Sequence, residues 1–273
     1  MSLEDCAAAL REHDPDRFGI CLLAPPKARA KLTTLYALNL ELARAPLAST
    51  EPLIAEMRLQ WWIERLEDIG AGKPQSHELL TPLAEAWGPR AAGFAPLAEA
   101  RRRDAAREPL DGPEAVVAYV RETAVPLARF AAEALGWEAA GGFAPPDPRG
   151  IFGHERSSAP AAAVIAAQAE GAGLAHWLAA LPALQGMGLG LWDASPQALA
   201  GIATKAQAKL AEARAQRRAV PRRLAPVLFA GAGVRAVLQA APRGAQALAG
   251  AAPSEFRRRL ALGAFALTHR WWI

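Results

Sequence analysis

Cysteine is scarce in this sequence of 273 residues. Only Cys6 and Cys21 occur, and their spacing fits neither a paired metal-ligand motif nor a CxxC redox motif. So few isolated cysteines exclude a fold held together by a framework of disulfides. We therefore expect two reduced thiols.

Strand-like stretches are nearly missing as well. Alternating runs of Val, Ile, Thr and aromatic residues are hard to find, whereas alanine is abundant and apolar residues recur mainly at helical spacing. The fold class is therefore predicted to be all-α. At 52% hydrophobic, the chain can bury the core of one large helical domain or two small ones.

Several common functional motifs are also absent. There is no GxSxG elbow, no HExxH zinc helix and no phosphate loop, because Gly72 and Lys73 lie in the wrong spacing. A net charge of +4 is too mild to predict a nucleic-acid partner. The acidic N-terminus lacks the pattern of a secretion signal, so we expect a cytoplasmic protein. The uncharged stretch 171–192 contains Pro182 and Gln185, which favours a buried helix ending in a loop over a membrane span.

The most regular stretch of the chain is 31–62, which predicts two helices joined by a short turn. Pro25 and Pro26 stand ahead of the first helix, and Pro46 closes it, since proline fits the first turn of a helix but breaks its interior. Apolar residues recur there at steps of three and four, and Asn39 falls within that stripe, on the side expected to be buried.

The second helix of this pair is apolar on two sides. Its first side carries Leu59, Trp62, Leu66 and Ile69, and its second side carries Ile54, Met57 and Trp61. Such a helix is expected to be packed by neighbours all round. Ser49 or Thr50 is expected to cap it, with Pro52 in its first turn.

The sequence LYALNLELARAP followed by EPLIAEMRLQWW resembles the start of the squalene/phytoene synthase family. The resemblance implies one all-helical domain over residues 1–273, built as an isoprenoid synthase-like bundle around a central cavity. The motifs Asn-x-Glu-Leu-Ala and Met-Arg-x-Gln-Trp-Trp are similar to a branch of the family that includes a mitochondrial complex I assembly factor.

Enzymes of this family ionise an allylic diphosphate with magnesium ions held by two aspartate-rich helical segments, because magnesium prefers hard oxygen ligands. The resemblance places the first cluster near Ala43 and Arg44 and the second near Ala180 and Leu184. No aspartate occurs between Asp16 and Asp68, and none occurs after Asp193. Glu41, the nearest substitute, lies about 160° around its helix from the buried stripe. The sequence thus predicts no metal site and no cofactor; magnesium is implied only if the chain is an enzyme after all.

Eight residues match family motifs but have no role assigned by the sequence. They are Asn39, Glu41, Arg58, Gln60, Trp61, Trp62, Asp104 and Tyr119. Asp104 has an alternative interpretation as a surface partner of a nearby arginine, and the run Arg101 to Arg103 reads as a solvated face. Arg58 and Gln60 have an alternative as partners of buried polar groups.

Three functions remain open. The first is a non-catalytic family member that assists assembly of respiratory complex I, with complex I subunits or assembly intermediates as partners; the resemblance implies the inner face of a bacterial cytoplasmic membrane. The second is a prenyl transferase that condenses isoprenoid diphosphates with an unusual metal site. The third is a protein that holds an isoprenoid or another lipid in an apolar cavity.

The rest of the chain is read as helices and connecting loops. Residues 70–78 form a linker, and residues 140–160 form a loop rich in Gly, Pro and Ser. Long helices are expected over 160–185 and 196–219. The C-terminal EFRRRLALGAFALTHRWWI is expected to pack as a helix against the bundle, with contact to a membrane surface as the alternative.

Overall fold

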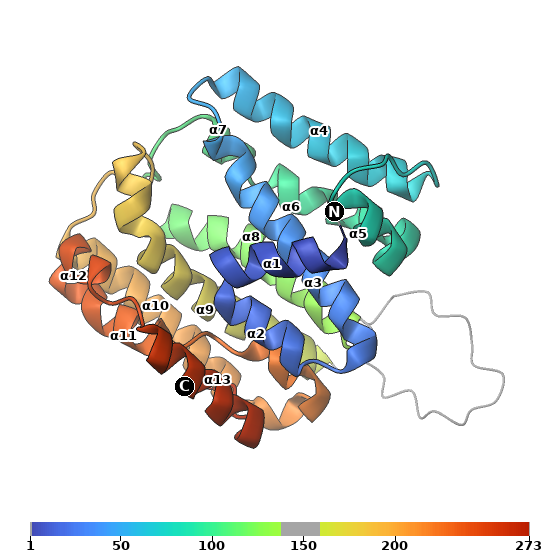
Figure 1. Cartoon of the computed structure of the whole chain (residues 1–273). Helices are drawn as coiled ribbons and strands as arrows, with labels where there is room; N and C mark the ends of the chain where they lie inside the picture. Colours follow the sequence, from blue (N-terminus) through green and yellow to red (C-terminus); the bar gives the residue numbers. More distant parts are fainter. Residues whose placement is uncertain (1, 138–158, 273) are drawn as a thin grey trace.

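The computed structural model describes residues 2–137 and 159–272. These residues form a single-domain bundle of helices, which confirms the all-α prediction (Figure 1). An isolated bridge between Leu110 and Leu191 is the only β-type pairing found in those ranges. The α-helices are α1 (Leu3–His13), α2 (Pro15–Leu23), α3 (Pro26–Arg44), α4 (Pro52–Gly70), α5 (Leu80–Trp87), α6 (Ala95–Glu99), α7 (Arg102–Ala105), α8 (Pro113–Ala134), α9 (Ala159–Gly186), α10 (Pro196–Ala215), α11 (Val234–Ala240), α12 (Ala245–Ala249) and α13 (Glu255–Thr268).

The predicted helix pair is α3 and α4, joined through a short 3-10 turn at Ala45–Leu47. Pro26 opens α3 and Pro52 opens α4, as the proline spacing predicts. The turn is held from outside by Arg107, whose guanidinium donates to the carbonyls of Ser49 and Leu47. The predicted cap position is wrong, because Glu51 occupies the N-cap and its side chain accepts no bond, although Ser49 Oγ accepts a hydrogen bond from the Glu51 backbone N–H at 3.1 Å.

Two hydrophobic clusters make up the core. The first joins α1 to α6 with the second half of α8, and Phe94 is one of its fully buried side chains. The second lies around the first half of α8, α9, α10 and α11, with Leu174 and Ile202 at its centre. Helices α8 and α9 contribute to both clusters, so they tie the two halves of the bundle together.

Close packing around α9 depends on small residues. A Cβ atom on Gly171 would lie 2.7 Å from the Cγ atom of Leu210 in α10, and one on Gly173 would lie 2.6 Å from Cγ1 of Val120 in α8. The absence of these two side chains lets α9 approach both neighbours. The helix ends at Gly186, so the uncharged stretch is a buried helix followed by a loop, as expected.

One prediction about α4 is wrong. Its first apolar side is buried, but its second side faces solvent. Leu53, Ile54, Met57 and Trp61 are 72%, 45%, 63% and 37% exposed. Leu53 and Met57 lie one turn apart on this side, and Trp61 follows one turn later. We call these four residues the α4 outer face.

Most of the other predicted segments are confirmed in outline. Residues 79–110 hold the short helices α5, α6 and α7 with a 3-10 segment at Gly88–Phe94. Helix α10 ends at Ala215, four residues before the expected boundary. The loop predicted for 140–160 falls almost entirely outside the described residues. No helix in 2–137 or 159–272 combines the length and apolar character needed to cross a bilayer.

Cys6 and Cys21 are buried and unpaired. Burial raises the pKa of the Cys21 thiol to about 11, so this thiol stays protonated at neutral pH.

Candidate functional site

A polar cluster brings together three of the eight motif residues. The Tyr119 hydroxyl in α8 donates to Asp104 Oδ2 in α7 at 2.6 Å. Arg101, just before α7, donates to the Tyr119 oxygen at 3.2 Å and to Asn39 Oδ1 in α3 at 3.4 Å. Asn39 is buried, as its place in the α3 stripe predicts. Three separate helices thus meet at one hydrogen-bonded network, which we call the Asp104 cluster.

The electrostatics of this cluster are set by burial. Burial raises the pKa of the Asp104 carboxyl, while the hydrogen bond from Tyr119 and the charges of Arg101 and Arg103 act in the opposite direction. Burial also raises the pKa of Tyr119, so its hydroxyl remains a donor at neutral pH. The structure therefore differs from the surface ion pair considered for Asp104: its partly buried carboxylate accepts a hydrogen bond from Tyr119.

Two arginines of the Arg101 to Arg103 run are partly buried and make contacts between helices, which the sequence pattern did not reveal. Arg101 bridges the Asp104 cluster, and Arg102 donates to Gln60 Oε1 at 2.6 Å and pairs with Glu56. The solvated-face prediction is wrong for both. Arg102 also has a local partner, Glu99, three residues earlier, but the other partners of the two arginines lie 18 to 62 positions away in the sequence, where local charge patterning carries no signal.

Four of the remaining motif residues lie along α4, the fifth, Glu41, lies in α3, and none of them joins the Asp104 cluster. Trp62 is buried and packs edge-on against Trp61, with ring centroids 5.0 Å apart, and both rings contact His77. Gln60 satisfies Arg102, in line with a structural role. Arg58 is exposed beside the α4 outer face, and no hydrogen bond or ion pair is found for it among the described residues. Its alternative role as partner of a buried group is therefore wrong.

The residues at the first implied magnesium position do not fit that ion. Ala43 and Arg44 stand where the resemblance places the aspartates. Glu41 is half-exposed and lies 3.8 Å from the Arg44 guanidinium. A single carboxylate that is paired with an arginine of its own helix is a poor ligand set for a divalent cation.

The second position fits no better. Glu170 is the buried carboxylate of α9, and it is engaged by Arg121 of α8 at 3.0 Å. Ala180 and Leu184 supply no oxygen ligand from their side chains. Within 2–137 and 159–272, no group of three or more His, Cys, Asp or Glu side chains is arranged to hold a metal ion. The side chains described at the two implied positions thus do not fit a magnesium ion.

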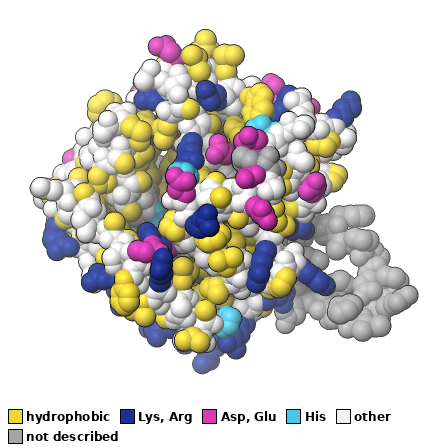
Figure 2. Space-filling view, in the orientation of Figure 1, with side chains coloured by type: hydrophobic (Ala, Val, Ile, Leu, Met, Phe, Trp, Pro, Cys, Tyr) yellow, Lys and Arg dark blue, Asp and Glu magenta, His cyan; other side chains and the backbone are white. Residues whose placement is uncertain are grey.

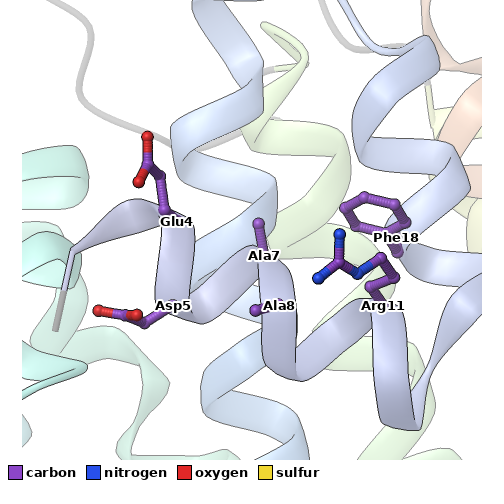
Figure 3. A pocket seen from close by; sticks show the side chains of 6 residues that line it. All are labelled: Glu4, Asp5, Ala7, Ala8, Arg11 and Phe18. Carbon is purple, nitrogen blue, oxygen red and sulfur yellow. The ribbon is translucent and has the colours of Figure 1, made fainter.

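Two hollows lie on the described surface, and the second of them includes Glu41, close to the first implied position. One, of about 420 Å³, runs along α1 and is lined by Glu4, Asp5 and Arg11 together with Phe18 of α2. Its two carboxylates lie at one end and Arg11 beside Phe18 at the other (Figure 3). The second, of about 160 Å³, lies between α1, α3 and α4 and includes Glu41, Trp62 and His77. Neither is the apolar central cavity that the resemblance implies.

We predict that Tyr119→Phe destabilises the protein by about 1–3 kcal/mol at pH 8 and by less at pH 4, because it leaves the Asp104 carboxylate without its donor. The raised pKa of Asp104 means that its favourable contribution is present below the unfolded-state value of 3.8 and is lost as pH rises through the folded-state value. Removing Tyr119 raises that pKa further and so enlarges the loss at high pH. Urea unfolding at the two pH values measures the difference.

Asp104→Asn provides the control for this prediction. With no ionisable group at position 104, Tyr119→Phe should cost the same at pH 4 and pH 8. A pH-dependent cost that persists in the double variant would show that Asp104 is not its source.

The fold is that of the helical prenyl synthases. A crystal structure of a dehydrosqualene synthase in complex with ligand matches with a TM-score of 0.70 at 12% identity, over 96% of this chain and 94% of that chain. The crystal structure of squalene synthase HpnC from Alicyclobacillus acidocaldarius matches with a TM-score of 0.59 at 17% identity, over 98% of this chain and 94% of that chain. At these identities the similarity establishes the fold alone.

The family model for squalene/phytoene synthase matches residues 10–175, and the chain belongs to that family. Among characterised proteins it is similar to the human "NADH dehydrogenase (ubiquinone) complex I, assembly factor 6", with 35% identity over 69 residues, or 25% of this chain. The Bos taurus protein of the same name is 33% identical over 69 residues. The match spans only 21% of the length of each of these two relatives.

Proposed function

We propose that this chain is a non-catalytic member of the squalene/phytoene synthase family that binds protein partners during assembly of respiratory complex I. Its partners in this proposal are complex I subunits or assembly intermediates, met on the cytoplasmic face of a bacterial membrane. The chain requires no metal or other cofactor for this role.

The proposal that the chain is not an enzyme rests on the two carboxylates nearest to the implied magnesium positions, because both are engaged in ion pairs. Glu41 is paired with Arg44, and Glu170 is paired with Arg121. An enzyme that ionises a diphosphate needs unpaired carboxylates converging on the metal ions that neutralise the leaving group. Arginines in direct contact with both glutamates oppose such a site.

Two features support the binding half. The first is the similarity to the complex I assembly factors, which is partial. The second is the α4 outer face, where Met57 and Trp61 of the motif stand exposed next to the unpaired Arg58. Exposed apolar side chains gathered on one helix face are typical of a surface that contacts another protein. Methionine, tryptophan and arginine are also enriched in such interfaces.

We predict no diphosphate release when the purified protein is incubated with farnesyl or geranylgeranyl diphosphate and magnesium. An active squalene or phytoene synthase assayed in parallel is the control, and circular dichroism establishes that the protein is folded. Release at a rate comparable to that of the control enzyme would overturn the non-catalytic assignment and favour the prenyl transferase.

The assembly half is tested by deleting the gene and measuring NADH:ubiquinone oxidoreductase activity in membranes. We expect that activity to fall several-fold, while succinate oxidation, which does not pass through complex I, stays unchanged. Equal activities in the deletion strain and its parent would overturn the assembly role.

A further inference from the structure

Helix α13 is apolar on two opposite sides. Its inner side packs on the bundle: Phe265 is buried against Phe229, with ring centroids 5.1 Å apart, and Leu262 lies against Gly19 of α2. Its outer side carries Phe256, Leu260 and Leu267, which are 74%, 61% and 85% exposed. At 100° per residue these three side chains fall within about 40° of one another. We call them the α13 outer stripe.

Arginines border this stripe. Arg257 and Arg259 flank it on its two sides near the N-terminus of α13, and both are exposed. Beyond the other end of the helix, the guanidinium groups of Arg217 and Arg270 lie 5.5 and 5.7 Å from the centre of the Trp272 ring. Hydrophobic and basic side chains lie together over the lower front of the molecule, where α13 runs (Figure 2). An apolar stripe bordered by arginines and a tryptophan is the pattern of a helix that lies on a membrane surface.

The charge of the whole chain is strongly uneven. Residues 213–273 contain eleven of the 31 basic residues but only one of the 27 acidic residues, Glu255. This segment therefore carries a net charge of +10, against −6 for residues 1–212, although the total is only +4. A positive field confined to one segment favours an anionic surface as its partner and opposes a like-charged one.

The orientation of α13 is fixed by its remaining arginine. Arg258 points toward the body of the protein and lies 3.2 Å from Asp16 Oδ1 in α2. Asp16 in turn accepts a hydrogen bond from the backbone of Ala232 at 3.3 Å. Because the inward-pointing arginine has an acidic partner in the body of the protein, the helix cannot rotate without breaking that pair. The outer stripe is consequently held toward solvent.

We propose that α13 binds the surface of a membrane that contains anionic lipids. The helix lies parallel to that surface, with Phe256, Leu260 and Leu267 inserted at the level of the headgroups and upper acyl chains and the arginines in contact with lipid phosphates. The attachment is peripheral, since the apolar contact is one side of one helix. This inference holds whether or not the chain assists in building complex I.

Co-sedimentation with vesicles tests the proposal. The full-length protein should bind vesicles of phosphatidylglycerol and phosphatidylcholine at low salt, bind much less in high salt, and bind weakly to phosphatidylcholine alone. Arg257→Gln with Arg259→Gln should weaken binding to the anionic vesicles by about 30-fold, or roughly fivefold for each charge. Leu260→Ser with Leu267→Ser should weaken it by at least about tenfold.

The matched control is Leu53→Ser with Met57→Ser, which removes two exposed apolar side chains from α4 and should leave vesicle binding unchanged. All of the substituted side chains are exposed, so circular dichroism should be unaltered in every variant. Retention of full binding by the α13 variants would overturn the proposal. So would failure of the unaltered protein to bind anionic vesicles at low salt, which would leave the stripe to a protein partner.

Discussion

A bacterial strain that carries Leu53→Ser with Met57→Ser in place of the native gene is expected to lose most of its complex I activity. These side chains are 72% and 63% exposed and form the most solvent-accessible part of the α4 outer face. Replacing both with serine removes apolar area that a partner would otherwise cover. Loss of two well-buried anchors commonly weakens an interface by more than about 100-fold. The free protein loses no internal packing that depends on these two side chains.

The measurement is NADH:ubiquinone oxidoreductase activity in membranes, together with the amount of the protein found by immunoblot. Met187→Ser changes another exposed methionine, on the loop after α9, and should leave complex I at its normal level. If the α4 variant supports normal activity, the α4 outer face is not where the partner binds. If the protein is depleted in that strain, its stability rather than its binding has changed, and the expectation fails.

Replacing Phe94 with alanine is expected to lower the free energy of unfolding by about 3–5 kcal/mol. Phe94 is fully buried, and its ring meets those of Trp87 and Phe130 edge-on at 4.9 and 4.7 Å. It therefore joins the 3-10 segment after α5 to α8. Truncating the ring removes its apolar burial and its aromatic contacts, and it leaves a cavity that the surrounding helices only partly close.

Urea unfolding followed by circular dichroism measures this loss. Phe256→Ala provides the comparison, because the same side chain is 74% exposed on α13, and its removal should change stability by less than about 0.5 kcal/mol. Similar losses at the two positions would mean that Phe94 is not packed as described.

The sequence predicted the α3 and α4 pair well because both helices begin at prolines and carry regular apolar stripes. The burial of Asn39 followed directly from its place in such a stripe. The exposure of this side of α4 was not predicted, for a physical reason. The apolar pattern of Ile54, Met57 and Trp61 indicates that burial of these side chains is favourable. It does not indicate whether they are buried by the same chain or by another protein.

The sequence predicted only some members of the Asp104 cluster and none of the contacts between them. Asp104 and Tyr119 were recognised from the family motifs, but their hydrogen bond requires that α7 and α8 fold back on each other. Arg101 was predicted to lie on a solvent-exposed face, because a run of three arginines is the sequence pattern that such a face also shows. Its contact with Asn39 spans 62 positions and depends on tertiary packing alone.

The positions of α4 and α13 determine how far from the membrane a partner protein would be bound. These helices lie at opposite ends of the molecule (Figure 1). With α13 resting on a bilayer, α4 points away from the lipid, into water, at a height set by the thickness of the bundle. The α4 outer face can then contact only those parts of a partner that project well above the membrane plane. The molecule then acts as a spacer of fixed length.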